Sequence, residues 1–140
     1  MYCTQADIEE RFGQAELVQL TDRTRTGQVD ATTVARAITD ASAEIEGYLA
    51  TRYSLPFASN PPVLVRLCCD IAIYNLFAAR RSGGMIEDVR TRYRDAVKLL
   101  ENISSGKVTL GVQPEPVQPD NTVLMVSAPS VWSRRDAVDE

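Results

Sequence analysis

A chain of 140 residues, 44% hydrophobic and 24% charged, is long enough for one domain with an extension and has the composition of a soluble globular protein. Its formal net charge of -4 disfavours a module that binds nucleic acid through phosphate contacts. The chain has no histidine, which excludes Ser-His-Asp catalysis and histidine-ligated metal sites. We therefore expect a protein that is not an enzyme and binds no cofactor or metal.

The N-terminal segment is acidic where a signal peptide would be basic and then apolar. No run approaches the roughly 20 apolar residues that span a bilayer. Cys3, Cys68 and Cys69 form an odd set without the spacing of a disulfide framework, so we expect buried thiols that act as small hydrophobic side chains. These features predict synthesis in a cytoplasm and no membrane partner.

Two short helical segments are predicted first. Thr4 suits the start of a helix because Asp7 follows three residues later, in a capping-box arrangement, and Gly13 ends this helix. Residues 14–20 form a further helical turn or two, with their two leucines facing inward. The polar and basic residues 21–28 should form a surface loop.

Three longer helices are predicted from apolar residues that recur every three to four positions. The first begins after Asp30 and runs to Tyr53. Asn60-Pro61-Pro62 favours a new helix start, with Asn60 as the cap. The helix at 63–81 is apolar on most faces and should be central. The last begins near Glu87, and Gly106 closes it. Buried stripes are expected at Val34, Ile38, Ala41, Ile45, Tyr48 and Leu49, and at Val89, Tyr93, Ala96, Val97, Leu100 and Ile103.

The C-terminal quarter does not continue this pattern. We expect a helical core at 1–106, a proline-rich linker at 107–120 and a docking arm at 121–140. Short strand-like segments are predicted at 108–110 and 123–126. The predicted fold is thus all-α, a bundle of about four main helices with an extended C-terminal arm. Because tryptophan and arginine dominate interface hot spots, we expect the arm to dock on a partner and to order there. The competing interpretation is that the arm folds back on its own core. The predicted docking residues are Val123, Leu124, Met125, Val126, Val131, Trp132, Arg134 and Arg135.

Thirteen of the fifteen basic residues are arginine, which favours multidentate pairing at interfaces. The possible subunit interface comprises Arg52, Tyr53, Arg80, Arg81, Arg90 and Arg94. For the segment with Arg52 and Tyr53, the competing interpretation is a helix end stabilised by aromatic packing and a proline stop. A solvated, salt-bridged face is the competing interpretation of the last four, with Glu87–Arg90 and Asp88–Arg92 as helix pairs. Asp70 lies within the apolar helix at 63–81 and should either face a partner such as an arginine or lie on an exposed strip.

An ordered series of residues extends over about residues 2–110. It comprises Tyr2-Cys3-Thr4 with Asp7, Phe12-Gly13, Leu20-Thr21-Asp22, Asp30, Ala41, Ile45, Tyr48-Leu49, Arg52-Tyr53, Leu55-Pro56, Cys69-Asp70-Ile71-Ala72, Tyr74, Leu76, Tyr93-Arg94, Ala96 and Leu100 through Gly106. The series resembles the small head–tail joining proteins of Mu-like tailed phages and prophages. The family pattern says little about residues 113–140.

The resemblance implies a structural protein of the virion neck, made in the host bacterial cytoplasm. Such connector, or adaptor, proteins form a homo-oligomeric ring, usually dodecameric, below the portal. The ring extends the DNA channel, through which DNA passes without specific binding, and offers a docking surface to a tail terminator or another neck or tail protein. Two other classes stay open: a small helical regulator that binds nucleic acid through the Arg80–Arg94 face, and an enzyme centred on Asp70.

Overall fold

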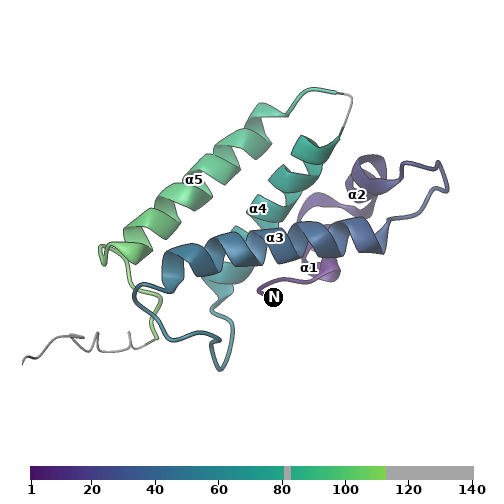
Figure 1. The fold of residues 1–140 in the computed structure, drawn as a ribbon. Coiled ribbons are helices and arrows are strands. Elements are labelled where there is room, and N and C mark those ends of the chain that lie inside the picture. Colours follow the sequence, from purple (N-terminus) through teal and green to yellow (C-terminus); the bar gives the residue numbers. More distant parts are fainter. Residues whose placement is uncertain (81–82, 113–140) are drawn as a thin grey trace, which may run out of the picture.

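The computed structural model describes residues 1–80 and 83–112, and its regular structure there is entirely helical (Figure 1). The helices are α1 (Gln5–Phe12), α2 (Gln14–Thr21), α3 (Ala31–Leu49), α4 (Pro62–Ala79) and α5 (Glu87–Ser104). The all-α prediction is confirmed. Five helices replace the expected four or so because the N-terminal segment forms two complete helices. Gly13 separates them at φ 89°, a conformation that glycine adopts without steric cost.

Helix α4 forms the centre of the core, as predicted. It runs beside α5, is crossed by α3 and also meets α1 and α2 (Figure 1). Ten of its residues are buried, and this accounts for a sequence that is apolar on most faces. By length and composition α4 could cross a membrane, contrary to our expectation that no segment would qualify. However, 56% of it is buried inside the bundle, as in the core helix of a soluble protein.

The predicted buried stripes of the other long helices are largely confirmed. Helix α3 buries Val34, Ile38, Ala41, Ile45 and Leu49, while Tyr48 is half-buried. Helix α5 buries Val89, Ala96, Leu100 and Ile103, and its remaining stripe residues are half-buried. The two leucines of α2 and the three cysteines also lie in the core, as expected.

Two helix starts follow the predicted capping chemistry and one does not. The Thr4–Asp7 capping box is present at α1, and the Asp30 side chain accepts from the backbone N–H groups of Thr32 and Thr33 at α3. The prediction that Asn60 caps α4 is wrong. Its side-chain amide instead donates to the backbone carbonyl of Met1 at 3.1 Å, and Pro61 precedes the helix without a side-chain cap.

Two further boundaries differ from the prediction. Helix α3 ends at Leu49 rather than Tyr53, although the Tyr53 N–H still reaches the Leu49 carbonyl at 2.9 Å through a turn. The predicted strand at 108–110 is not formed. A short strand needs a partner, and within the described residues the Leu110 N–H instead donates to the Tyr53 hydroxyl at 3.2 Å.

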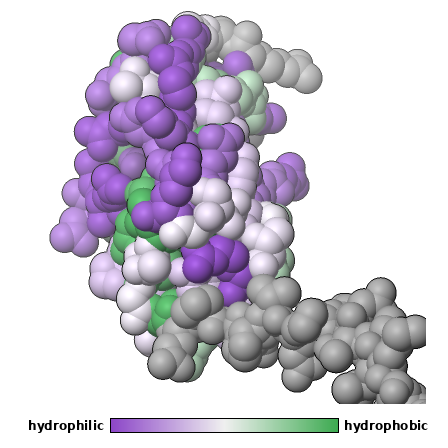
Figure 2. Space-filling model, turned by 90° about the vertical axis from the view of Figure 1, so that its left-hand side faces the viewer, coloured by the Kyte–Doolittle hydropathy of each residue, from purple (hydrophilic) through white to green (hydrophobic). Residues whose placement is uncertain are grey.

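Hydrophilic residues cover most of the molecule seen from the end at which α3 and α5 finish, with smaller hydrophobic areas between them (Figure 2). Arg90, Arg94 and Lys98 contribute to the exposed side of α5. A surface of this kind presents local contact sites rather than one broad apolar face.

Candidate interaction surfaces

The C-terminal ends of α3 and α5 are tied together where the described chain finishes. The Arg52 Nη1 donates to the Ile103 carbonyl at 3.1 Å, and its guanidinium lies 5.8 Å from the centre of the Tyr53 ring. Tyr53 is only 4% exposed and contacts Leu110 through its hydroxyl. Arg52 and Tyr53 therefore both make contacts within the chain, close to the point where the described residues end.

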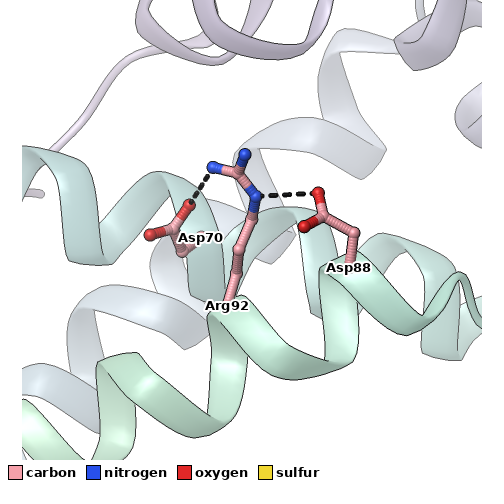
Figure 3. Close-up of polar contacts among 3 residues, drawn as sticks. All are labelled: Asp70, Asp88 and Arg92. Carbon is pink, nitrogen blue, oxygen red and sulfur yellow. Dashed lines mark hydrogen bonds and ion pairs between the residues drawn. The ribbon is translucent and has the colours of Figure 1, made fainter.

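Asp70 faces an arginine, as predicted. Arg92 of α5 lies between two carboxylates, with its Nη1 3.9 Å from Asp70 Oδ1 and its Nε 3.0 Å from Asp88 Oδ2 (Figure 3). Its guanidinium also lies 5.8 Å from the centre of the Phe12 ring. Burial raises the pKa of the Asp70 carboxyl, and the Arg92 charge opposes part of that rise. The arrangement joins α1, α4 and α5 and matches the predicted structural ion pair.

A shallow groove of about 490 Å³ runs along α5. Its lining residues are Arg90, Tyr93, Arg94, Val97, Lys98 and Glu101. Tyr93 is fixed on the bundle side because its ring stacks on Tyr74 at 3.9 Å and its hydroxyl donates to Glu44 Oε1 at 2.9 Å. Three cations around a tyrosine and a valine favour a partner with acidic groups and some apolar surface. We call this surface the α5 groove.

Two arginines of the predicted interface, Arg80 and Arg90, make contacts within the bundle. Arg80 lies with its guanidinium 5.4 Å from the centre of the Phe77 ring, and Arg90 pairs with Glu87 at 3.4 Å. The Glu87–Arg90 and Asp88–Arg92 helix pairs are thus confirmed. Arg94 is exposed and has no ion-pair partner among the described residues. Arg81 lies outside the described residues.

A second recess, also about 490 Å³ in volume, lies between the N-terminal segment and the first half of α3. It is lined by Met1, Tyr2, Cys3, Thr4, Gln5, Asp7, Ala31, Val34, Ala35, Ile38, Asn60 and Val65. We call it the N-terminal groove. Met1 is 69% exposed at its edge, and Ala31 and Ala35 are exposed on α3. Its mostly apolar lining suits an apolar chain segment.

Sequence patterns did not reveal the N-terminal groove. Its walls come from three stretches that are distant in sequence, and the Tyr2 N–H reaches Ser42 Oγ at 3.3 Å, 40 residues away. One lining residue, Cys3, also contacts Cys68, with 3.0 Å between the sulfurs. No spacing rule links residues so far apart, although the apolar character of Val34 and Ile38 marked one wall as buried.

The eight predicted docking residues of the arm, Val123, Leu124, Met125, Val126, Val131, Trp132, Arg134 and Arg135, all lie outside the described residues. Upstream of them, Leu110 and Val112 are half-buried and pack against the core. The described chain therefore stays attached to the bundle as far as Val112, beyond the predicted start of the linker at residue 107.

Comparison with known proteins gives a family match over most of the chain. A family model described as Bacteriophage Mu, Gp36 matches residues 2–127. The chain is 35% identical over 136 residues to the Mu-like prophage FluMu protein gp36 of Haemophilus influenzae, covering 96% of this chain and 94% of that protein. It is also 35% identical over 138 residues to gene product J of Escherichia phage Mu, covering 96% and 95%. The match extends past residue 110, where the residue pattern ended, and includes residues 123–126.

Proposed function

The chain belongs to the family of bacteriophage Mu Gp36, and we propose that it is the head–tail connector of a Mu-like phage particle. In this proposal it is a non-enzymatic subunit of a homo-oligomeric, dodecameric ring in the virion neck. The ring binds below the portal, extends the DNA channel and offers a docking surface to a tail terminator or another neck protein. DNA passes through the channel without specific binding.

The observation that carries the proposal is the extent of the family match. The match to residues 2–127 includes the helical core and part of the arm, and the two Mu-type relatives align over 96% of this chain. Core and arm are therefore shared as one unit by proteins of Mu-like phages. The resemblance of the core residues to head–tail joining proteins supports a neck position for this unit.

The surfaces of the core support ring formation. A closed ring needs a heterologous contact, in which each subunit uses two different surfaces. The described residues provide two recesses of different character, the mostly apolar N-terminal groove and the basic α5 groove. Repeating one modest contact around a ring multiplies its effect, so neither surface needs to be large.

The arm supplies the apolar residues that such a surface needs. Val123 to Val126 form a continuous apolar run, and Val131 with Trp132 follows. We propose that this arm engages the portal or a neighbouring subunit. Ordering it there would cost on the order of 2–5 kcal/mol, which burial of its apolar side chains offsets. The N-terminal groove is one surface with a lining suited to it.

Electron microscopy of the protein mixed with its portal tests the proposal. Full-length protein should form a ring on the portal, whereas protein truncated after Val112 should not. A full-length Trp132→Ser variant is the matched control, because it keeps the length of the arm and removes its largest apolar side chain. If the truncated protein also forms rings on the portal, the arm has no role in this assembly. If both the full-length and the truncated protein stay monomeric and do not bind the portal, the connector function is overturned.

A nucleic-acid-binding regulator is the alternative, and the α5 groove is the observation that favours it. Arg90, Arg94 and Lys98 recur every four residues along α5 and would face one phosphate backbone. However, Arg90 is paired with Glu87, and Arg92 is held by two carboxylates. The alternative predicts salt-sensitive DNA binding by the isolated protein, and the absence of a gel shift at low salt would exclude it.

A further inference from the structure

The thiols of Cys3 and Cys68 lie in direct contact inside the bundle. The Cys3 Sγ donates to the Cys68 Sγ across 3.0 Å, and the two residues are 65 positions apart in the chain. Cys3 belongs to the segment before α1, whereas Cys68 lies on α4. Both are free thiols and both are buried. The contact therefore joins the N-terminal segment to the central helix at one point.

The two sulfurs have unequal surroundings. Cys68 accepts from the Cys3 thiol, and the Ser42 hydroxyl lies 3.7 Å from its sulfur. These hydrogen bonds outweigh burial and lower the pKa of Cys68 to about 7. The pKa of Cys3 is raised, chiefly by its hydrogen bond to Cys68 and then by that to Cys69. In this pair Cys68 is the sulfur that ionises, and the thiolate is the reactive form of cysteine.

A route from solvent leads to Cys3, whereas Cys68 is fully buried and is not among the residues that line the groove. Cys3 lines the N-terminal groove together with Met1 and Thr4. The groove, at about 490 Å³, is wide enough to admit a molecule the size of hydrogen peroxide. Cys69 occupies the next position of α4 and is also fully buried. It provides a matched internal comparison on the same helix.

We propose that Cys3 and Cys68 form an oxidation site, which a hydroperoxide converts into an intramolecular disulfide. The Cys68 thiolate attacks one peroxide oxygen, the O–O bond breaks, and hydroxide leaves, so that Cys68 becomes a sulfenic acid. The Cys3 sulfur then attacks the Cys68 sulfur. The S–S bond forms, and the thiol proton leaves with the sulfenic oxygen as water. In total, two thiols and one hydrogen peroxide give one disulfide and two waters.

Mass spectrometry of the folded, full-length protein after treatment with hydrogen peroxide tests this site. We expect the intact mass to fall by the two hydrogens of one disulfide. Peptide mapping should place the link between Cys3 and Cys68, with Cys69 still open to alkylation after unfolding. The disulfide closes a loop that includes α1, α2 and α3, so the oxidised protein should melt roughly 10 °C higher. Reduction with dithiothreitol should reverse both changes.

Three variants separate the roles of the sulfurs. Cys69→Ser should form the same disulfide between Cys3 and Cys68. Cys3→Ser should stop at a Cys68 sulfenic acid that dimedone traps, whereas Cys68→Ser should give neither the disulfide nor the dimedone adduct. The corresponding alanine variants serve if a serine variant does not fold. A link through Cys69, a link between two chains, or survival of all three thiols in peroxide would overturn the proposal.

Discussion

Replacing Arg92 by methionine should destabilise the bundle far more than the same change at Arg90. The two side chains are almost equally exposed, at 51% and 52%, and both lie on α5. They differ in their contacts. Arg90 makes an exposed pair with Glu87, worth about 0.2–0.5 kcal/mol. Arg92 contacts Asp70, Asp88 and the Phe12 ring.

The magnitude follows from these contacts. The exposed pair with Asp88 contributes about 0.3–0.5 kcal/mol, and the contact with Phe12 about 0.5–1 kcal/mol. Asp70, whose side chain is 9% exposed, would lose its partner, which costs about 1–3 kcal/mol. We expect Arg92→Met to lower the free energy of unfolding by about 2–4 kcal/mol and Arg90→Met by less than about 0.5 kcal/mol. Urea denaturation followed by circular dichroism at pH 7 measures both.

The pH dependence of stability shows whether the charge on Asp70 stabilises or destabilises the fold. Burial raises the folded-state pKa of Asp70 above its ordinary value, so its charge costs stability once the pH exceeds that pKa. The drop in the free energy of unfolding caused by Arg92→Met should therefore be largest at neutral pH. It should become smaller on acidification, as Asp70 becomes protonated. Asp70→Asn should recover part of the loss in the Arg92→Met background. Equal stability of Arg92→Met and Arg90→Met, or no recovery with Asp70→Asn, would refute this account.

Two further predictions concern α5. Tyr93→Phe keeps the stack on Tyr74 but removes the hydrogen bond to Glu44, so we expect a loss of about 1 kcal/mol in urea denaturation. Because burial raises the pKa of Tyr93 to about 12, above the ordinary 10, stability should fall as pH rises through this interval; ultraviolet absorbance follows the ionisation. Gly106→Ala should lower the melting temperature more than Gly111→Ala. Both glycines have positive φ, but only at Gly106 would the added carbon meet Arg52, 2.8 Å from its Nη1. An equal drop in melting temperature for the two variants would contradict this prediction and would show that Arg52 moves aside.

Local signals predicted most of the fold. The spacing of Val34, Ile38 and Ile45 and the position of Asp30 were enough to identify α3 and its start. The apolar character of α4 identified the central helix in the same way. These features depend on residues within a few turns of one another, so a sequence pattern records them directly.

Features that depend on distant residues were missed. The end of α3 was predicted too late because Tyr53 is buried in the turn after the helix, where its hydroxyl accepts from the Leu110 N–H. Asn60 was expected to cap α4, but a carbonyl 59 residues earlier takes its amide. The N-terminal groove forms only when the N-terminal segment, α3 and the start of α4 come together, whereas all the lining residues of the α5 groove lie on one helix. The Asp70–Arg92 pair was partly foreseen because a buried carboxylate requires a cation from somewhere in the fold.

The contact between Cys3 and Cys68 also sets an order of events on the ribosome. Cys3 leaves the exit tunnel first but has no partner until a point 65 residues later in the chain has been translated. At 5–20 residues per second this wait lasts roughly 3–13 s. During that interval α1 can form through its own capping box, and the Tyr2 N–H can reach Ser42 of α3. The contact between Cys3 and α4 is therefore completed only after α1, α2 and α3 have been translated.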